Sequence, residues 1–152
     1  MKRPDAFHLP FSEFRRLHRR ALRAQKRGHL EVVGLLATSG DTPRILTLVF
    51  LENRARESGR WEVRRDQIAR VRAELRERGL RFLGLFHSHP VSEAILGPRD
   101  LRNTPTGSAH LVYDVCGLEP RLYLIRRRNG RRRVERLTLS VGRSRKSQIL
   151  KS

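Results

Sequence analysis

Only one of the 152 residues is a cysteine, Cys116, so the chain forms no internal disulfide, as is typical of proteins in a reducing compartment. No run of apolar residues approaches the roughly 18 that a membrane-spanning helix needs. The first ten residues contain Lys2 and Arg3 but no apolar stretch, so we expect no secretory signal. These absences predict a soluble cytoplasmic protein without a membrane partner.

Acidic and aromatic residues are scarce. Asp and Glu number 15 against 34 Lys and Arg, which gives a formal net charge of +19. A hydrophobic content of 38% is too high for a disordered tail, and the length favours one domain with one sizeable core. Aromatic residues make up 6% and are not interleaved with the arginines, so stacking on nucleic-acid bases is poorly supported.

Apolar periodicity predicts helices and strands around one central sheet. Helices are expected over residues 12–27, with Ser12 as cap and Gly28 as stop, and over 66–78. Residues 89–106 are loop-like, apart from a short helix that opens at Pro98. Asn129 and Gly130 predict a type I′ hairpin turn. Strands are expected over residues 29–38, 44–51, 61–63, 80–86, 109–115, 121–127 and 132–141. This order predicts an α+β or mixed α/β domain over residues 1–141, followed by a basic tail over 142–152.

The sequence His87-Ser88-His89-Pro90, followed by Asp100, carries the strongest chemical signal. Residues two apart in an extended chain point to the same side, and Pro90 favours that conformation at His89. Two imidazoles and one carboxylate are the ligand set of an open catalytic zinc site. The alternative is a pair of ordinary histidines at a strand end.

Glu31 lies within the apolar run of residues 30–36, where an unpartnered carboxylate would be costly to bury. A zinc site beside it would explain this position, with Glu31 as the base. A salt-bridged carboxylate in this arginine-rich chain, or one at a strand edge, is the alternative.

With these motifs the sequence resembles the JAMM (MPN+, JAB-domain) metalloprotease family. The resemblance runs from Glu31 and the following Gly34-Leu35-Leu36 through residues 51–53 and 84–90 to Asp100. It implies a single MPN-like domain, whose mostly antiparallel sheet is flanked by two main helices and a short helix at the metal site. It also implies that His87, His89 and Asp100 bind Zn²⁺ and that Glu31 is the general base.

The resemblance also indicates the kind of member and of substrate. Few residues separate Asn103 from Ser108, which leaves little room for the insertion that eukaryotic relatives use to grip ubiquitin. A compact prokaryotic-type member is therefore implied. Its substrates would be ubiquitin-like or sulfur-carrier-like proteins joined through their C-terminus to a conjugate or fusion partner.

One position departs from the family pattern. Three residues before Asp100 the family has a serine whose hydroxyl helps to hold the oxyanion, and this chain has Gly97. Loss of one such donor typically lowers turnover by roughly 10²–10³. Ser88 and Ser92 are the nearby hydroxyls that can replace it.

The arginines have two interpretations. Those of residues 12–27 fall mostly on the face opposite Phe14 and Leu17, which is typical of a solvated helix face. Residues 126–133, the arginine hairpin, are either solvated or a docking site for an acidic protein or nucleic acid. We interpret His110, Trp61, Tyr113 and Cys116 as structural residues.

Two main functions follow from the sequence. The first is a zinc-dependent peptidase or isopeptidase acting on a ubiquitin-like or sulfur-carrier-like protein. The alternative is a catalytically weak or inactive module of the same fold that binds an acidic protein or nucleic acid through its arginines. Chelator-sensitive cleavage indicates the first function, and binding that falls steeply with salt indicates the second.

Overall fold

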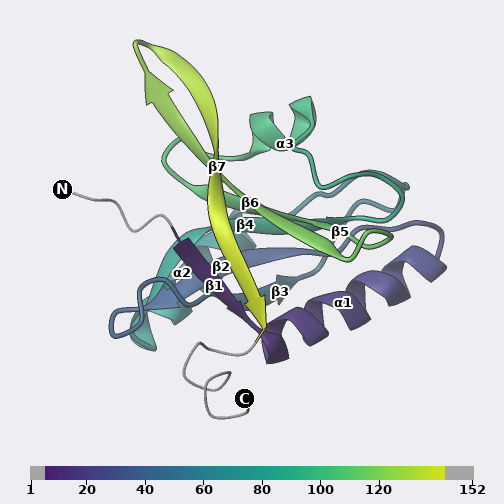
Figure 1. The fold of residues 1–152 in the computed structure, drawn as a ribbon, viewed down its shortest axis with the longest axis horizontal. Coiled ribbons are helices and arrows are strands. Elements are labelled where there is room, and N and C mark those ends of the chain that lie inside the picture. Colours follow the sequence, from purple (N-terminus) through teal and green to yellow (C-terminus); the bar gives the residue numbers. More distant parts are fainter. Residues whose placement is uncertain (1–5, 143–152) are drawn as a thin grey trace.

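The computed structural model describes residues 6–142, which form seven strands and three helices (Figure 1). The helices are α1 (Phe11–Lys26), α2 (Arg65–Glu77) and α3 (Pro98–Asn103). The strands are β1 (Ala6–Pro10), β2 (Val33–Ser39), β3 (Thr47–Leu51), β4 (Leu80–His89), β5 (Ala109–Asp114), β6 (Glu119–Arg128) and β7 (Arg131–Gly142). No helix among the described residues is long and apolar enough to cross a membrane.

All seven strands belong to one sheet, in the order β1-β7-β6-β5-β4-β2-β3. The pairs β1–β7 and β4–β5 are parallel, and the other neighbouring strands are antiparallel. The predicted mixed α/β fold with a mostly antiparallel sheet is therefore confirmed.

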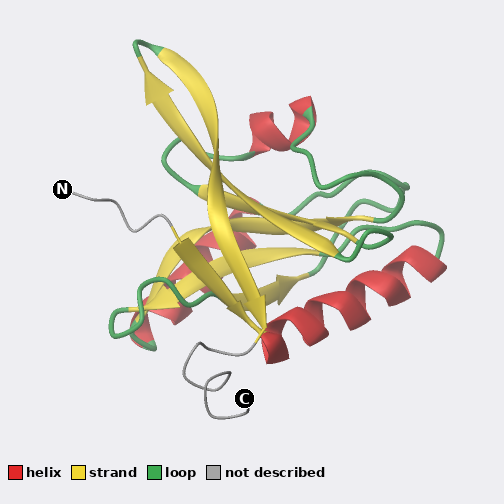
Figure 2. Cartoon of the chain, in the orientation of Figure 1, coloured by secondary structure: helices red, strands yellow, loops and turns green. Residues whose placement is uncertain are grey.

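The helices cover the two faces of the sheet (Figure 2). Successive residues of β2 point to opposite faces, so Leu36 packs with Leu17 of α1 while Leu35 packs with Leu75 of α2. Gly34 leaves room for the ring of Phe86 from β4, because a side chain there would collide with that ring. The apolar residues of β2 are thus buried on both sides, which agrees with their nearly continuous hydrophobic run.

Most predicted elements are present, with shifted ends. The strands expected from residues 29 and 44 begin at Val33 and Thr47, and the strand expected to end at 86 continues to His89. Predicting a strand over 61–63 was wrong, because its backbone joins the sheet nowhere. Ser12 does not cap α1, because the helix already begins at Phe11 and Ser12 lies within its first turn.

One strand was not predicted. β1 is only five residues long and ends at Pro10, so its apolar alternation is too short to recognise in the sequence. It is held by parallel pairing with β7, in which Leu9 lies opposite Val141. The expected basic tail lies outside the described residues from position 143 onward.

The arginine hairpin joins β6 to β7 and projects beyond the rest of the sheet (Figure 1). Asn129 and Gly130 have φ values of 51° and 75°, as the predicted type I′ turn requires.

Candidate metal centre

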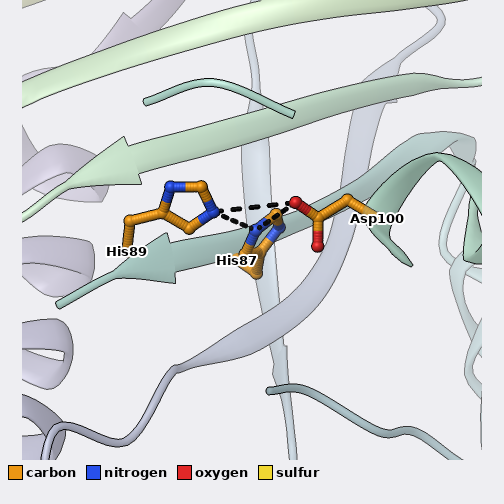
Figure 3. A group of neighbouring side chains, drawn as sticks. All are labelled: His87, His89 and Asp100. Atoms are coloured by element: carbon orange, nitrogen blue, oxygen red, sulfur yellow. Dashed lines mark hydrogen bonds and ion pairs between the residues drawn. The ribbon is translucent and has the colours of Figure 1, made fainter. Parts of the chain in front are cut away.

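β4 and α3 bring the three predicted metal ligands together (Figure 3). His87 and His89 end β4 and share one face of the strand, and Asp100 lies in the first turn of α3. The Nε2 atoms of His87 and His89 are 2.9 Å apart. Oδ2 of Asp100 lies 3.3 Å from Nε2 of His87 and 3.6 Å from Nε2 of His89.

These separations suit a tetrahedral cation. Ligands at zinc distances of about 2.0–2.2 Å are separated by about 3.3–3.6 Å in a tetrahedron. Both separations from Asp100 fall in that range, and the separation between the two imidazole nitrogens is slightly shorter. Two nitrogens and one oxygen are also a donor set that zinc prefers.

Hydrogen bonds fix which nitrogen of His87 carries the proton. The Thr104 hydroxyl donates to the backbone carbonyl of Asp100 at 2.6 Å, so it accepts from Nδ1 of His110, also at 2.6 Å. Burial lowers the pKa of His110 far below its ordinary value, so the ring is neutral and its Nε2 accepts. Nδ1 of His87, at 2.6 Å, is then the donor to this Nε2.

His89 reaches the same state through a different bond. Its Nδ1 lies 2.6 Å from the backbone carbonyl of Glu93, which can only accept a hydrogen bond. When both rings are neutral, the Nε2 atoms of His87 and His89 each carry a lone pair, and these lone pairs face each other and the Asp100 carboxylate. Such a group of three acceptors is stable only around a cation or a proton.

The Asp100 carboxylate is itself held on both oxygens. The indole N–H of Trp61 donates to Oδ1, and the backbone N–H of Gly97 donates to Oδ2, each at 2.9 Å. Bonds of this kind orient a metal-binding carboxylate before the metal arrives.

The pKa directions also indicate a site for positive charge. Burial alone would raise the pKa of Asp100, but the facing imidazoles of His87 and His89 outweigh it and lower that pKa. Burial alone would lower the pKa of His89, but its bonds to Asp100 and the Glu93 carbonyl raise it. For the fully buried His87, burial dominates and lowers the pKa. Protons therefore compete with a metal mainly at His89.

Glu31 lies beside this group, on the segment that enters β2. Val33 pairs with His87, and the backbone N–H of Ser88 donates to the carbonyl of Val32, so the alternation of both strands turns Glu31 toward the face of His89. The residue is 6% exposed, and its Oε2 has no hydrogen-bond partner among the described residues. Burial raises the pKa of Glu31 to about 7.

An open cleft of about 480 Å³ has Glu31 and two of the three candidate ligands, His89 and Asp100, in its wall. Glu31, His89, Asp100, Gly97 and Ser92 line it together with Arg99 and Arg102. The orphaned Glu31 oxygen and the three converging acceptors fit a bound zinc ion with a carboxylate beside it. A proton acceptor and a cation at the base of an open cleft can together activate a water molecule.

The two candidate oxyanion residues lie in different places. Ser88 is fully buried, and its hydroxyl accepts a hydrogen bond from the backbone N–H of Val32 at 2.9 Å. It lies between two residues that face the metal site, so its own side chain points to the other face of β4. Gly97 lines the cleft and supplies only a backbone N–H, and Ser92 also lines it.

Sequence reasoning missed three residues that support the ligands. His110 and Trp61, interpreted as structural, contact His87 and Asp100 directly, and Thr104 completes the chain of hydrogen bonds. His110 reaches the site because β5 runs parallel to β4 and places His110 opposite Leu85. The strand pairing that would reveal this contact is not visible in local sequence spacing.

Comparison with known proteins supports the fold. The family model described as prokaryotic homologs of the JAB domain matches residues 13–133. No curated protein matches the chain in sequence.

Three solved structures illustrate the likeness. The solution structure of protein DSY2949 from Desulfitobacterium hafniense has a TM-score of 0.70 and 23% identity, covering 91% of this chain and 94% of that one. A protein from Salinibacter ruber has a TM-score of 0.60 and 21% identity, covering 91% and 92%. AF2198, a JAB1/MPN domain protein from Archaeoglobus fulgidus, has a TM-score of 0.55 and 18% identity, covering 90% and 97%. At these identities the likeness shows the fold alone.

Proposed function

This chain belongs to the family of prokaryotic homologs of the JAB domain, and on that premise we propose that it is a zinc-dependent peptidase or isopeptidase. Its substrate would be a ubiquitin-like or sulfur-carrier-like protein, cleaved at its C-terminus from a conjugate or fusion partner. One observation carries the proposal: three acceptors on His87, His89 and Asp100 converge beside a buried oxygen of Glu31 that has no hydrogen-bond partner within residues 6–142.

Glu31 has the properties of the proton carrier. When bound, zinc would supply Lewis-acid polarisation of the scissile carbonyl and lower the pKa of the attacking water. With a pKa of about 7, Glu31 can both accept a proton and release it near neutral pH. It takes the proton of the attacking water and delivers it to the nitrogen of the leaving amine.

The cleft supplies the remaining parts of the reaction. The hydroxyl of Ser92 is the side-chain donor that we assign to the developing oxyanion, because Gly97 has no hydroxyl and that of Ser88 lies on the other face of β4. The open cleft suits an extended tail, which is the form in which ubiquitin-like proteins present their C-terminus. We place this reaction in the cytoplasm, in agreement with the single cysteine.

Cleavage of a ubiquitin-like or sulfur-carrier fusion by the zinc-loaded protein tests the proposal. Glu31→Gln should lower the cleavage rate by roughly 10²–10⁴ while one equivalent of zinc stays bound, because Glu31 is not a ligand. Chelation should abolish cleavage by the wild type, and added zinc should restore it. Unchanged cleavage by Glu31→Gln would refute the mechanism.

A second candidate is a binding module in which catalysis is weak or absent. The projecting arginine hairpin and the net charge of +19 favour it. In this case the protein would bind zinc, cleave no ubiquitin-like fusion and hold an acidic protein or a nucleic acid. A steep fall of affinity with salt would identify phosphate contacts.

A further inference from the structure

A second cleft, of about 310 Å³, also has Glu31 in its wall, and the other charged residues that line it are all arginines. Its wall on the side of α1 contains Arg20 and Arg23 of the helix and Arg27 at the C-terminal cap of the helix. The segment of residues 30–32 and the loop residues Asn53 and Ala55 form the rest of the wall. Glu31 lines both this second cleft, here called the arginine cleft, and the 480 Å³ cleft beside His89 and Asp100, here called the metal-side cleft, so the two clefts adjoin at Glu31.

The three arginines form one basic surface. They are spaced three and four residues apart, so they follow one stripe of the helix. No carboxylate among the described residues forms a salt bridge with any of them, whereas Arg16 on the same helix pairs with Glu13 at 2.8 Å. Arg23 lies in the last turn, where a cation offsets the helix dipole, but this effect does not account for Arg20.

The proposed role of Glu31 indicates which part of a substrate would enter this cleft. In the proposed function Glu31 delivers its proton to the leaving amine, so the segment attached to that amine lies next to Glu31. The metal-side cleft then receives the acyl side of the scissile bond, and the arginine cleft receives the leaving side.

We propose that the arginine cleft binds an acidic segment of the leaving protein, close to the amine that Glu31 protonates. This assignment rests on the proposed function and narrows its substrate to conjugates with Asp or Glu beside the attachment point. Three guanidinium groups that form no salt bridge within residues 6–142 are complementary to carboxylates, which they can bind through paired N–H donors.

The residues of the cleft favour a polypeptide over a nucleic acid. No aromatic side chain lines it. The nearby ring of Phe50 is covered by the guanidinium of Arg20, 4.2 Å from the ring centroid, and by that of Arg16 at 5.2 Å. Single-stranded nucleic acids bind mainly by stacking bases on exposed aromatic rings, and this cleft offers none.

The test compares two triple variants with the same change of charge. The cleft variant is Arg20→Gln, Arg23→Gln, Arg27→Gln. The control is Arg70→Gln, Arg76→Gln, Arg78→Gln, whose exposed positions lie on α2 or at its C-terminal cap and line neither cleft at Glu31. The probe is a fluorescein-labelled peptide of alternating Glu and Gly, whose binding is measured at low salt with zinc-free protein.

We expect the cleft variant to weaken binding of the peptide by about tenfold or more and the control by less than about twofold. Equal weakening by both variants would overturn the proposal in favour of a general field effect. If the cleft variant loses more affinity for a single-stranded DNA oligomer than for the peptide, the proposal is overturned in favour of a nucleic-acid ligand. Arg20→Gln alone repeats the comparison, against Arg70→Gln, if the triple variant fails to fold.

Cleavage separates this proposal from the proposed function. Fusions whose leaving segment carries four Glu should be cleaved with a lower KM than fusions with four Gln, and the cleft variant should remove the difference. If no fusion is cleaved but only the cleft variant loses the peptide, the peptidase proposal fails and the arginine cleft remains a site for an acidic segment. If fusions are cleaved with no preference for Glu, the peptidase proposal stands and the assignment of an acidic segment to the arginine cleft fails.

Discussion

The metal centre and the arginine hairpin are built by opposite means. Each of the three candidate metal ligands makes a hydrogen bond to another part of the chain, so its position is fixed before a metal binds. In the hairpin, Arg128, Arg131 and Arg133 are exposed, so any partner would meet them mainly as charge. The centre therefore depends on geometry, and the hairpin depends on charge and ionic strength. The predictions below test this division.

The largest effect is expected for the stability of the metal-free protein when Glu31 is replaced. Its pKa of about 7 exceeds the ordinary value of 4.5, so between these pH values the folded state binds more protons than the unfolded state. Stability from this group therefore falls as pH rises from about 4.5 to 7. At pH 8, Glu31→Gln should raise the free energy of unfolding by at most about 3 kcal/mol, and at pH 4 it should change little.

Urea denaturation of zinc-free protein at both pH values measures this difference. Glu52→Gln, which makes the same change at an exposed carboxylate, is the matched control. A gain from Glu31→Gln that is equal at both pH values would show that burial of the charge is not its cause.

The next effect concerns zinc affinity. His110→Leu removes the acceptor for Nδ1 of His87, so His87 loses the bond that keeps its Nε2 free, and zinc affinity should fall by about 10–100-fold. Thr104→Val should have the same direction. Competition with a chromophoric chelator measures the affinity, and ¹⁵N chemical shifts of the imidazole report the tautomer of His87 in the zinc-free protein.

His18→Leu is the control for this prediction. His18 also makes one short bond, from its Nδ1 to the Tyr113 hydroxyl at 2.7 Å, but it does not contact a zinc ligand. Its replacement should leave zinc affinity unchanged. Loss of zinc affinity in both variants would mean that general destabilisation, and not the bond to His87, is responsible.

These residues also show what the sequence could and could not predict. The helices, six of the seven strands and the approach of His87, His89 and Asp100 follow from periodicity and short spacings. The bond from His87 to His110 depends on the pairing of β4 with β5, and the bond from Trp61 to Asp100 depends on the path of an irregular segment. Such contacts are set by tertiary packing, which local patterns do not encode.

A smaller effect is expected from restoring the hydroxyl at position 97. Gly97 has a φ of −79°, and a Cβ there would lie 3.4 Å from Oδ2 of Asp100, so a serine can be accommodated with little displacement. Gly97→Ser adds a second hydroxyl to the one that we assign to Ser92, so it should raise the cleavage rate of a ubiquitin-like fusion by about tenfold and leave zinc affinity unchanged. If Gly97→Ser has no effect and Ser92→Ala slows cleavage, the Ser92 hydroxyl alone is sufficient for the oxyanion.

The smallest effects are expected in the arginine hairpin, where one residue, Arg132, also contacts a residue beside the candidate metal centre. The triple variant Arg128→Glu, Arg131→Glu, Arg133→Glu should associate with an acidic partner several-fold more slowly and with a flatter salt dependence, without a change in zinc affinity.

Arg132 differs from these three because its guanidinium donates to the backbone carbonyl of Thr104, the residue that supports His110. Arg132→Gln should therefore weaken zinc binding about twofold while hardly changing the salt dependence. Association rates by stopped flow and zinc affinities by chelator competition measure both effects. If the triple reversal changes zinc affinity more than Arg132→Gln does, charge in the hairpin acts on the centre at a distance, and the division between the two regions does not hold.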